Sequence, residues 1–138
     1  MISVRKQEVV KLENVLHLYQ AVGWTNYTHQ PQMLEKSLSH SLAIYLALDG
    51  EAIVGLVRLV GDGFSSVFVQ DLIVLPSYQR QGIGSALMKE ALRDFKDAYR
   101  VQLATDQTEK NLEFYRSLGF ETLSTYDCTG MIWVERKK

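Results

Sequence analysis

Residues 67–95 decide the fold of this chain; they read VFVQDLIVLPSYQRQGIGSALMKEALRDF. The first part, Val67 to Leu75, is rich in β-branched and aromatic residues and is stopped by Pro76, so it predicts a buried strand. A short polar connection leads to the turn Gly82-Ile83-Gly84. After the turn, apolar residues recur at helical spacing and predict an amphipathic helix that starts directly from the glycines.

The glycine turn at the start of this helix is suited to binding a phosphate group. The first N–H groups of a helix have no partner inside the helix, and the helix dipole places partial positive charge there. Gly82 and Gly84 carry no Cβ, so an anionic group can approach the backbone closely. Arg80 adds a cation and Ser85 adds a hydroxyl group.

Two common nucleotide-binding motifs do not match this turn. A Walker loop requires GxxxxGK[ST], which the sequence lacks. A dinucleotide-binding fingerprint requires GxGxxG directly after the strand, whereas Leu87 occupies the third glycine position and residues 76–81 separate the strand from Gly82. A nucleotide is therefore a remote ligand, and a purely structural strand-to-helix turn is the alternative to a phosphate loop.

The composition is typical of one soluble globular domain. The chain has 138 residues, of which 46% are hydrophobic and 22% are charged, and both fractions are average. The net charge of −1 argues against a dedicated binder of nucleic acid or of an anionic membrane. Cys128 is the only cysteine, and the histidines show no ligand spacing, so neither a disulfide nor a metal site is expected. No apolar run is long enough to span a membrane, and we expect a cytoplasmic protein.

The rest of the sequence predicts alternating strands and helices. A strand at residues 2–6 is followed by two helices, the second of which begins near Pro31. Asp49-Gly50 is a strong hairpin signal between two apolar strands. Beyond the central helix we expect a short strand, a last helix capped by Thr108 and ended by Gly119, and two closing strands. These four elements are residues 101–104, residues 108–118, residues 120–123 and residues 131–134.

Two segments resemble the GNAT superfamily of N-acetyltransferases. The loop at residues 79–84, Gln-Arg-Gln-Gly-Ile-Gly after Leu-Ile-Val-Leu-Pro, is similar to the pyrophosphate loop that binds acyl-CoA in that family. Residues 114–120, FYRSLGF, resemble its FYxxxGF segment. The expected order, β-α-α-β-β-β-α-β-α-β-β, is also the family's order from about residue 2 to residue 134. The resemblance implies a single α/β (α+β) domain over residues 1–138, with a mixed, mainly antiparallel sheet flanked by helices.

The resemblance also implies acetyl-CoA as co-substrate and assigns the residues that hold it. Backbone groups of the central strand pair with the pantetheine arm, and one N–H polarises the thioester carbonyl. The glycine loop holds the pyrophosphate. The implied cofactor-binding residues are Leu72, Ile73, Val74, Gln79, Arg80, Gln81, Gly82, Ile83, Gly84, Ser85, Asn111 and Tyr115. The three strand residues can be core residues at the same time, because their proposed contacts are made by the main chain.

Tyr115 matches the family tyrosine that protonates the departing CoA thiolate. A thiol pKa near 8.5 against about 10 for a phenol makes it a modest acid, so hydrogen bonding can supply much of its effect. A packed aromatic residue is the alternative. The sequence departs from the family pattern at Thr108, where Asn is usual, and at Asn111, where a small residue is usual. Asn111 is either a replacement CoA contact or a solvated helix residue.

A general base and an acceptor site are less clearly marked. An amine with a lysine-like pKa is almost entirely protonated at neutral pH, so a carboxylate or an ordered water must take its proton. Asp71 on the central strand is the candidate base, although its side chain faces away from Leu72 and Val74 and a hydrogen-bonding role is the alternative. Trp24 and Tyr27 are candidate substrate-binding residues, and packing of helices against the sheet is the alternative for them.

The leading hypothesis is an acetyl-CoA-dependent N-acetyltransferase that acetylates an amine directly, without an acyl-enzyme. The acceptor, a small molecule or a protein N-terminus, is not specified by the sequence. The rival hypothesis is a CoA-binding sensor or regulatory module without catalytic activity, motivated by the Thr108 and Asn111 departures. A homodimer is a further expectation, because an exposed closing strand can pair with a second chain.

Overall fold

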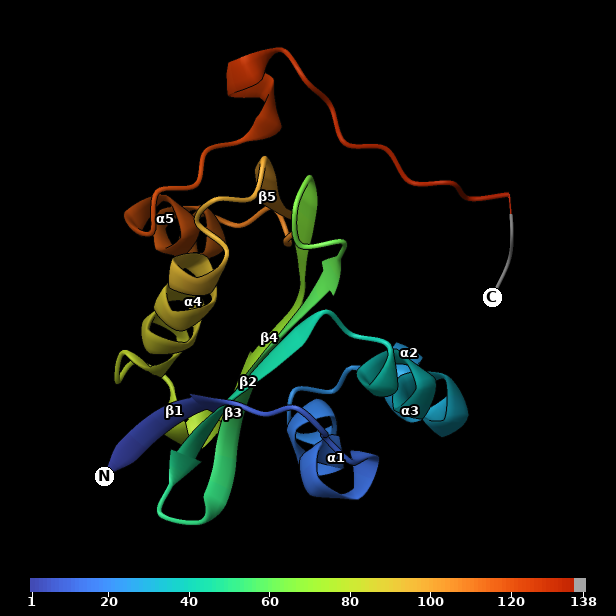
Figure 1. Ribbon diagram of the computed structural model, residues 1–138, viewed down its shortest axis with the longest axis vertical. Coiled ribbons are helices and arrows are strands. Elements are labelled where there is room, and N and C mark those ends of the chain that lie inside the picture. Colours follow the sequence, from blue (N-terminus) through green and yellow to red (C-terminus); the bar gives the residue numbers. More distant parts are fainter. Residues whose placement is uncertain (136–138) are drawn as a thin grey trace. The chain divides into compact units, whose positions relative to one another are not determined.

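A five-stranded sheet in the order β1-β2-β3-β4-β5 organises residues 1–104 (Figure 1). The computed structural model describes residues 1–135. The first four strands pair with one another in antiparallel fashion, and β5 pairs in parallel with β4. This arrangement confirms the predicted mixed, mainly antiparallel sheet. The strands are β1 (Ile2–Lys6), β2 (Ala43–Asp49), β3 (Ala52–Gly61), β4 (Ser66–Val74) and β5 (Arg100–Leu103).

Helices cover both faces of this sheet (Figure 1). Three of them, α1 (Leu12–Ala21), α2 (Thr25–Thr28) and α3 (Pro31–Ser39), lie on one face, and α4 (Ile83–Asp94) lies on the other. Pro31 occupies the first turn of α3, as predicted, because its missing N–H would have no helical partner there. The short helix α2 was not predicted and interrupts the aromatic-rich segment that follows α1.

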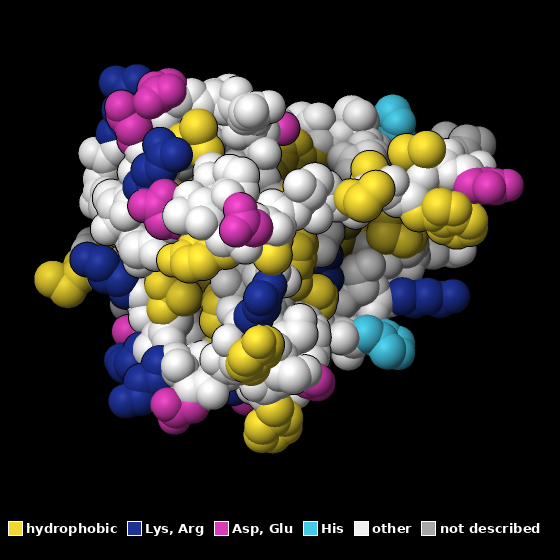
Figure 2. Space-filling view, turned by 90° about the horizontal axis from the view of Figure 1, so that it is seen from above, with side chains coloured by type: hydrophobic (Ala, Val, Ile, Leu, Met, Phe, Trp, Pro, Cys, Tyr) yellow, Lys and Arg dark blue, Asp and Glu magenta, His cyan; other side chains and the backbone are white. Residues whose placement is uncertain are grey.

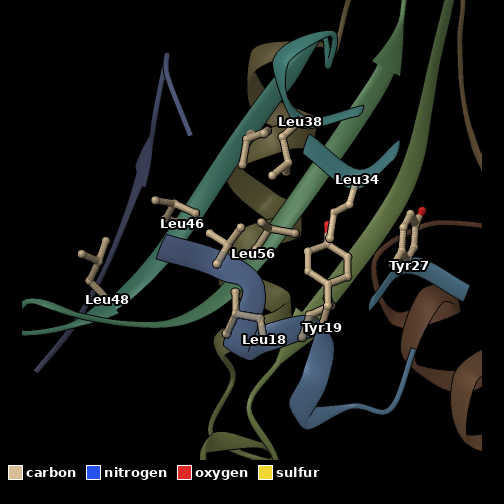
Figure 3. Packing of buried hydrophobic residues seen from close by; sticks show 11 residues of the cluster. Leu18, Tyr19, Tyr27, Leu34, Leu38, Leu46, Leu48 and Leu56 are labelled. Carbon is tan, nitrogen blue, oxygen red and sulfur yellow. The ribbon is translucent and has the colours of Figure 1, made fainter. Parts of the chain in front are cut away.

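The main core lies between the sheet and the three-helix layer. Leu18 and Tyr19 of α1, together with Leu34 of α3, point toward Leu46 and Leu56 of the strands (Figure 3). Each of these five side chains is almost fully buried. The nearly continuous apolar character of β2 follows from this position, because both faces of that strand are covered.

The described residues 105–135 belong to a second compact unit. Its helix α5 (Glu109–Ser117) begins as predicted, since the Thr108 hydroxyl accepts the N–H of Asn111 at 3.2 Å and thereby satisfies one of the free donors of the first turn. The helix ends before Gly119, which adopts a positive φ of 101° typical of a glycine that terminates a helix.

The two closing strands predicted from the sequence are absent from residues 105–135. Residues 123–126 instead form a 3₁₀ turn, in which the hydroxyls of Thr122, Ser124 and Thr125 interact with one another. Such local hydrogen bonds compete with a strand ladder. Residues 131–134 form no strand either.

Leu34→Ala is expected to destabilise the protein by about 2–5 kcal/mol, because it opens a cavity beneath α3 where Leu34 is fully buried. Its neighbour Met33 is 37% exposed, and Met33→Ala is the matched control, with an expected change of about 0.5 kcal/mol or less. Urea unfolding measures both. Equal losses for the two variants would contradict the described packing of α3.

Candidate active site

The N-terminus of α4 presents backbone donors that the helix does not use. No side chain caps this end, and its first turn contains no acidic residue. The N-cap residue Gly82 has a φ of 81°, a left-handed conformation that glycine adopts without steric cost. The N–H groups of Ile83, Gly84 and Ser85 therefore point out of the helix end, where the helix dipole favours an anion.

The loop before Gly82 is held in place by its own side chains. Gln79 Nε2 donates to the Val74 carbonyl oxygen at 3.0 Å, and Gln81 Nε2 lies 3.4 Å from the Ser77 carbonyl oxygen. Arg80 has a φ of 67°, a conformation that costs energy in a residue with a Cβ and that is concentrated at functional sites. These glutamine side chains therefore shape the loop, while the exposed Arg80 side chain extends from it.

Leu72 and Val74 direct their backbone N–H groups to an edge of β4 that no described strand pairs with. Pairing of β4 with β5 ends at Val69, whereas pairing with β3 continues to Val74. The Leu75 N–H donates to the Val54 carbonyl oxygen on the β3 side at 2.9 Å. Because amides alternate in direction along a strand, those of Leu72 and Val74 face the opposite side, where no described strand pairs with them. Ile73 directs its amide toward β3 and its buried side chain into the core.

A β-bulge at Gln70 separates this open edge from the paired part of β4. Arg58 pairs with Asp71, but the next residue of β3, Leu59, pairs with Val69, so Gln70 has no partner opposite it. A bulge reverses the alternation of side chains. As a result, Asp71 lies on the same face as Arg58, beneath the three-helix layer, rather than on the face of Val69.

Asp71 is saturated with hydrogen bonds at this position. Its carboxylate accepts from Arg58 Nε at 2.7 Å and from the hydroxyls of Tyr19 and Tyr27, each at 2.8 Å. Asp71 is 2% exposed and Arg58 is 4% exposed. Burial first, and then the negative charge of Asp71, raise the pKa of Tyr19 and that of Tyr27, so both phenols stay protonated and donate.

The guanidinium of Arg58 extends the network to the third helix. Its Nη1 atom lies 3.2 Å from Ser41 Oγ and 3.4 Å from the Ser37 carbonyl oxygen, and its Nη2 atom lies 3.2 Å from the Tyr27 hydroxyl. Gln70 Nε2 lies 3.4 Å from the same hydroxyl. The network thus connects β3 and β4 with all three helices of the layer.

Sequence reasoning missed Arg58 and Tyr19 as partners of Asp71. The available signal was charge complementarity: Arg58 is the one charged residue among the apolar residues 52–60, and Asp71 interrupts the next apolar strand in the same way. Buried charges are paired in folded proteins. Their register, however, depends on the bulge, which the sequence did not reveal.

Trp24 and Tyr27 form an aromatic cluster with Tyr19 beside this network. Tyr19 meets both of the other rings edge to face, with centroids 6.1 Å and 5.1 Å away, and the tilted Trp24–Tyr27 pair is 6.2 Å apart. Tyr27 is buried, whereas Trp24 is partly exposed. Trp24 therefore offers ring surface to a ligand, while Tyr27 mainly fixes the cluster.

Tyr115 and Asn111 lie on α5, in the second unit. Tyr115 contacts Phe114 and Phe120 edge to face at 4.9 Å and 5.9 Å, and its hydroxyl makes no hydrogen bond within the described residues. Burial raises the Tyr115 pKa. The Asn111 amide donates to Thr105 Oγ1 at 3.1 Å and lies 3.4 Å from the Asp106 carbonyl oxygen. Asn111 thus fixes the loop before α5, and its side-chain oxygen accepts no bond among those residues.

Comparison with known proteins decides the family. The sequence model of the acetyltransferase (GNAT) domain matches residues 40–122, more than half of the chain. The chain belongs to the GNAT family. An acetyltransferase of this family from Streptococcus pneumoniae is 77% identical, with a TM-score of 0.92 over 99% of this chain and 100% of that one.

More distant relatives agree with this assignment. GCN5-related N-acetyltransferase 1 of Arabidopsis thaliana, a chloroplastic protein, is 28% identical over 97% of this chain and 68% of its own length. The chain spans less than half the length of the next three curated relatives. A GNAT acetyltransferase of Elizabethkingia anophelis, solved with acetyl-CoA bound, shares the fold at 19% identity, with a TM-score of 0.64 over 87% of this chain and 76% of that one.

These findings confirm the predicted class, an acetyl-CoA-dependent N-acetyltransferase, and nothing in them favours the sensor hypothesis. Within the described residues 1–135, no group of three or more His, Cys, Asp or Glu side chains is arranged to hold a metal ion. No helix in that range is long and apolar enough to cross a membrane.

Asp71→Asn is expected to destabilise the protein by about 3–5 kcal/mol, because it leaves the buried Arg58 guanidinium without a counter-charge. The matched control is Glu90→Gln, which removes one of the two acidic partners of Arg93, a side chain that is 66% exposed; an exposed pair contributes about 0–1 kcal/mol. Urea denaturation compares the two variants. An Asp71→Asn effect as small as that of Glu90→Gln would contradict the buried pair.

Proposed function

We propose that this protein transfers the acetyl group of acetyl-CoA directly to an amine bound in the same complex. The observation that carries the proposal is the continuity between two sets of free backbone N–H groups. The first set is the backbone N–H groups of Leu72 and Val74, at the end of β4 where the Gln79 side chain bonds the strand. The loop that follows leads to the second set, the free N–H groups at the start of α4. An extended ligand with a pyrophosphate at one end fits this arrangement.

Each part of this surface has a distinct role in the proposal. Ile83, Gly84 and Ser85 donate backbone N–H groups to the pyrophosphate, and Arg80 adds a compensating charge. Gln79 and Gln81 support the loop through the bonds described above. The amides of Leu72 and Val74 hold the pantetheine arm, and one of them donates to the thioester oxygen as negative charge develops on it.

Tyr115 is proposed as the acid that protonates the departing CoA thiolate. One property supports this role: its hydroxyl is not engaged within the described residues. Burial raises the Tyr115 pKa, so the phenol stays protonated at neutral pH but is a weaker acid. Because an ordinary thiol is already more acidic than a phenol, Tyr115 contributes a moderate rate factor. Asn111 acts indirectly by fixing the loop before α5.

Asp71 is proposed to position the acceptor site rather than to contact the amine. Both carboxylate oxygens accept hydrogen bonds and the residue is almost fully buried, so an ordered water is the better acceptor of the proton. Asp71 instead holds Tyr27, and through the aromatic cluster Trp24, beside the bulge. The exposed part of the Trp24 ring then forms a wall for a small amine or a peptide N-terminus.

The proposal also covers the partners of the protein, its location in the cell and its need for a metal ion. Acidic and basic side chains are interspersed on the face shown in Figure 2, and the net charge is −1. Both observations favour partners other than nucleic acid or an anionic membrane. We propose a cytoplasmic location and a need for no metal ion.

The test is release of free CoA thiol from acetyl-CoA in the presence of polyamines, arylalkylamines, aminoglycosides and peptides with a free N-terminus. Transfer predicts thiol release that depends on one class of amine, together with an acetylated product of matching mass. A protein that is stabilised by acetyl-CoA but releases no thiol with any amine would be a sensor. A protein that acetyl-CoA does not stabilise would refute the assigned site as well.

Arg80→Ala is expected to weaken acetyl-CoA binding about tenfold or more, since a charge-assisted hydrogen bond contributes about 1.5–3 kcal/mol. The control is Lys89→Ala, which removes the same charge from an exposed position farther along α4. Calorimetric titration at two salt concentrations measures both. Equal affinities for the two variants would contradict the role of Arg80.

Tyr115→Phe is expected to lower kcat on the order of 10²-fold while leaving acetyl-CoA affinity within a few fold. Since burial raises the Tyr115 pKa, the wild-type rate should show no decline from ionisation of this phenol below about pH 10. Steady-state rates across pH test both statements. Unchanged kcat in Tyr115→Phe would rule out the acid role.

A further inference from the structure

The connection between β4 and α4 carries a tyrosine that has no role in the proposed acetyl-CoA site so far. Pro76–Tyr78 form a 3₁₀ turn directly before the loop of residues 79–82. The Tyr78 hydroxyl donates to Asp49 Oδ2 at 2.7 Å, and Asp49 is the last residue of β2. Both side chains are partly buried. The bond therefore joins the connection to the β2–β3 hairpin, 29 residues earlier in the chain.

This bond reaches farther along the chain than the other hydrogen bonds of the connection. Among the described residues, the remaining side-chain bonds of residues 76–82 are those of Gln79 and Gln81, which reach back only five and four residues. The backbone N–H groups of Tyr78 and Gln79 bond three residues back. Such local bonds shape the connection, whereas the bond to Asp49 fixes its place against a distant part of the sheet.

Arg80 shows why the loop needs such an anchor. Its φ of 67° costs energy in a residue with a Cβ, and a conformation of this kind persists only where the surrounding structure fixes it. On one side of Arg80, α4 holds the chain, since the Gly82 carbonyl oxygen accepts the Ala86 N–H at 3.0 Å. On the other side, the anchored Tyr78 lies two residues before Arg80.

We propose that Tyr78 and Asp49 are positioning residues that hold this loop in its binding conformation before acetyl-CoA binds. The inference rests on the proposed function, because it assumes that the loop and the start of α4 bind the pyrophosphate. A loop that is already ordered loses less conformational freedom when a ligand binds, so the ligand is bound more tightly. The two side chains act through the loop and do not contact the ligand.

The ionisation states of the two side chains maintain the bond at neutral pH. The hydrogen bond from Tyr78, and then the N-terminal amine of Met1 at 3.3 Å from Asp49 Oδ1, hold the Asp49 pKa below its ordinary value. The same bond to Asp49 raises the Tyr78 pKa above its ordinary value. Asp49 therefore stays ionised and Tyr78 stays protonated, so the effect of the bond on affinity should be constant from about pH 6 to 8.

Calorimetric titration of Tyr78→Phe with acetyl-CoA tests the positioning role. This variant loses the hydroxyl and keeps the ring, and we expect about three- to tenfold weaker binding, because the ligand must then order the loop. With both substrates saturating, kcat should stay within about twofold of the wild type. The control is Tyr99→Phe, since Tyr99 is 78% exposed and its hydroxyl makes no hydrogen bond among the described residues; its affinity should equal that of the wild type.

A double-mutant cycle tests whether the two side chains act through their shared bond. Asp49→Ala removes the acceptor and is expected to weaken acetyl-CoA binding by about the same factor as Tyr78→Phe. The double variant should bind no more weakly than either single variant, because the second substitution has no bond left to remove. Circular dichroism verifies that all variants are folded.

Hydrogen exchange of the ligand-free protein separates positioning from a general loss of stability. The backbone N–H groups of residues 78 and 79 donate to the carbonyl oxygens of Leu75 and Pro76. They should exchange faster in Tyr78→Phe than in the wild type, because the connection opens locally more often. The amides of β2 should exchange at the same rate in both proteins, whereas a general loss of stability would accelerate them too.

Several results would overturn the positioning role. They are wild-type affinity in Tyr78→Phe, an equal loss in Tyr99→Phe, losses that add in the double variant, and exchange that is faster throughout the sheet. A wild type that does not bind acetyl-CoA would refute the proposed function and the positioning role together. Binding without acetyl transfer would refute transfer alone, and the affinities of the variants would still decide the role of Tyr78.

Discussion

The buried ion pair between Arg58 and Asp71 is the interaction on which the site described here depends. It joins β3 to β4 beside the bulge. Its carboxylate also accepts hydrogen bonds from the hydroxyls of Tyr19 and Tyr27 in the helix layer. An ion pair in the core is costly to desolvate and is favourable only when its remaining donors and acceptors are satisfied. Here every buried polar side-chain atom of the described residues has a partner, so the network fixes one arrangement of helices and strands.

The bulge that brings Asp71 to Arg58 also organises the neighbouring edge of β4. On one side of Gln70, β4 is paired with both neighbours; on the other side, Leu72 and Val74 lack a strand at one edge. The main-chain amides left there continue toward the donors at the start of α4. The same local irregularity therefore supports the core on one face of the sheet and opens main-chain donors at its edge. A long ligand can thus be bound largely by backbone groups, whose positions are set by the fold.

The family and the element order as far as α5 could be predicted from the sequence because local rules determine them. Gly82, the Asp49-Gly50 hairpin and the Thr108 cap each depend on residues within a few positions of one another, and the structure has all three. Arg58 and Tyr19 could not be assigned in this way, because they meet Asp71 from positions 13 and 52 residues away. The closing strands at residues 120–123 and 131–134 were wrong, because strand propensity is a weak signal that the surrounding structure can override; residues 123–126 form a 3₁₀ turn instead.

The sequence also identified which residues lie in or near the candidate site better than it assigned the role of each residue. Asp71 was selected as a possible base because it is a carboxylate on the central strand, and its hydrogen bonds now favour a positioning role. Gln79 and Gln81 were selected with the phosphate loop, and their side chains support that loop instead. In both cases the deciding property was which atoms already had partners, and that property belongs to the folded chain.

A crystal structure of the protein with acetyl-CoA bound would test the central claim most directly. The account predicts pyrophosphate oxygens within about 2.7–3.2 Å of the N–H groups of Ile83, Gly84 and Ser85. It also predicts the pantetheine arm hydrogen-bonded along the Leu72–Val74 edge of β4. Acetyl-CoA bound elsewhere, with that edge and the α4 N-terminus both solvated, would contradict it.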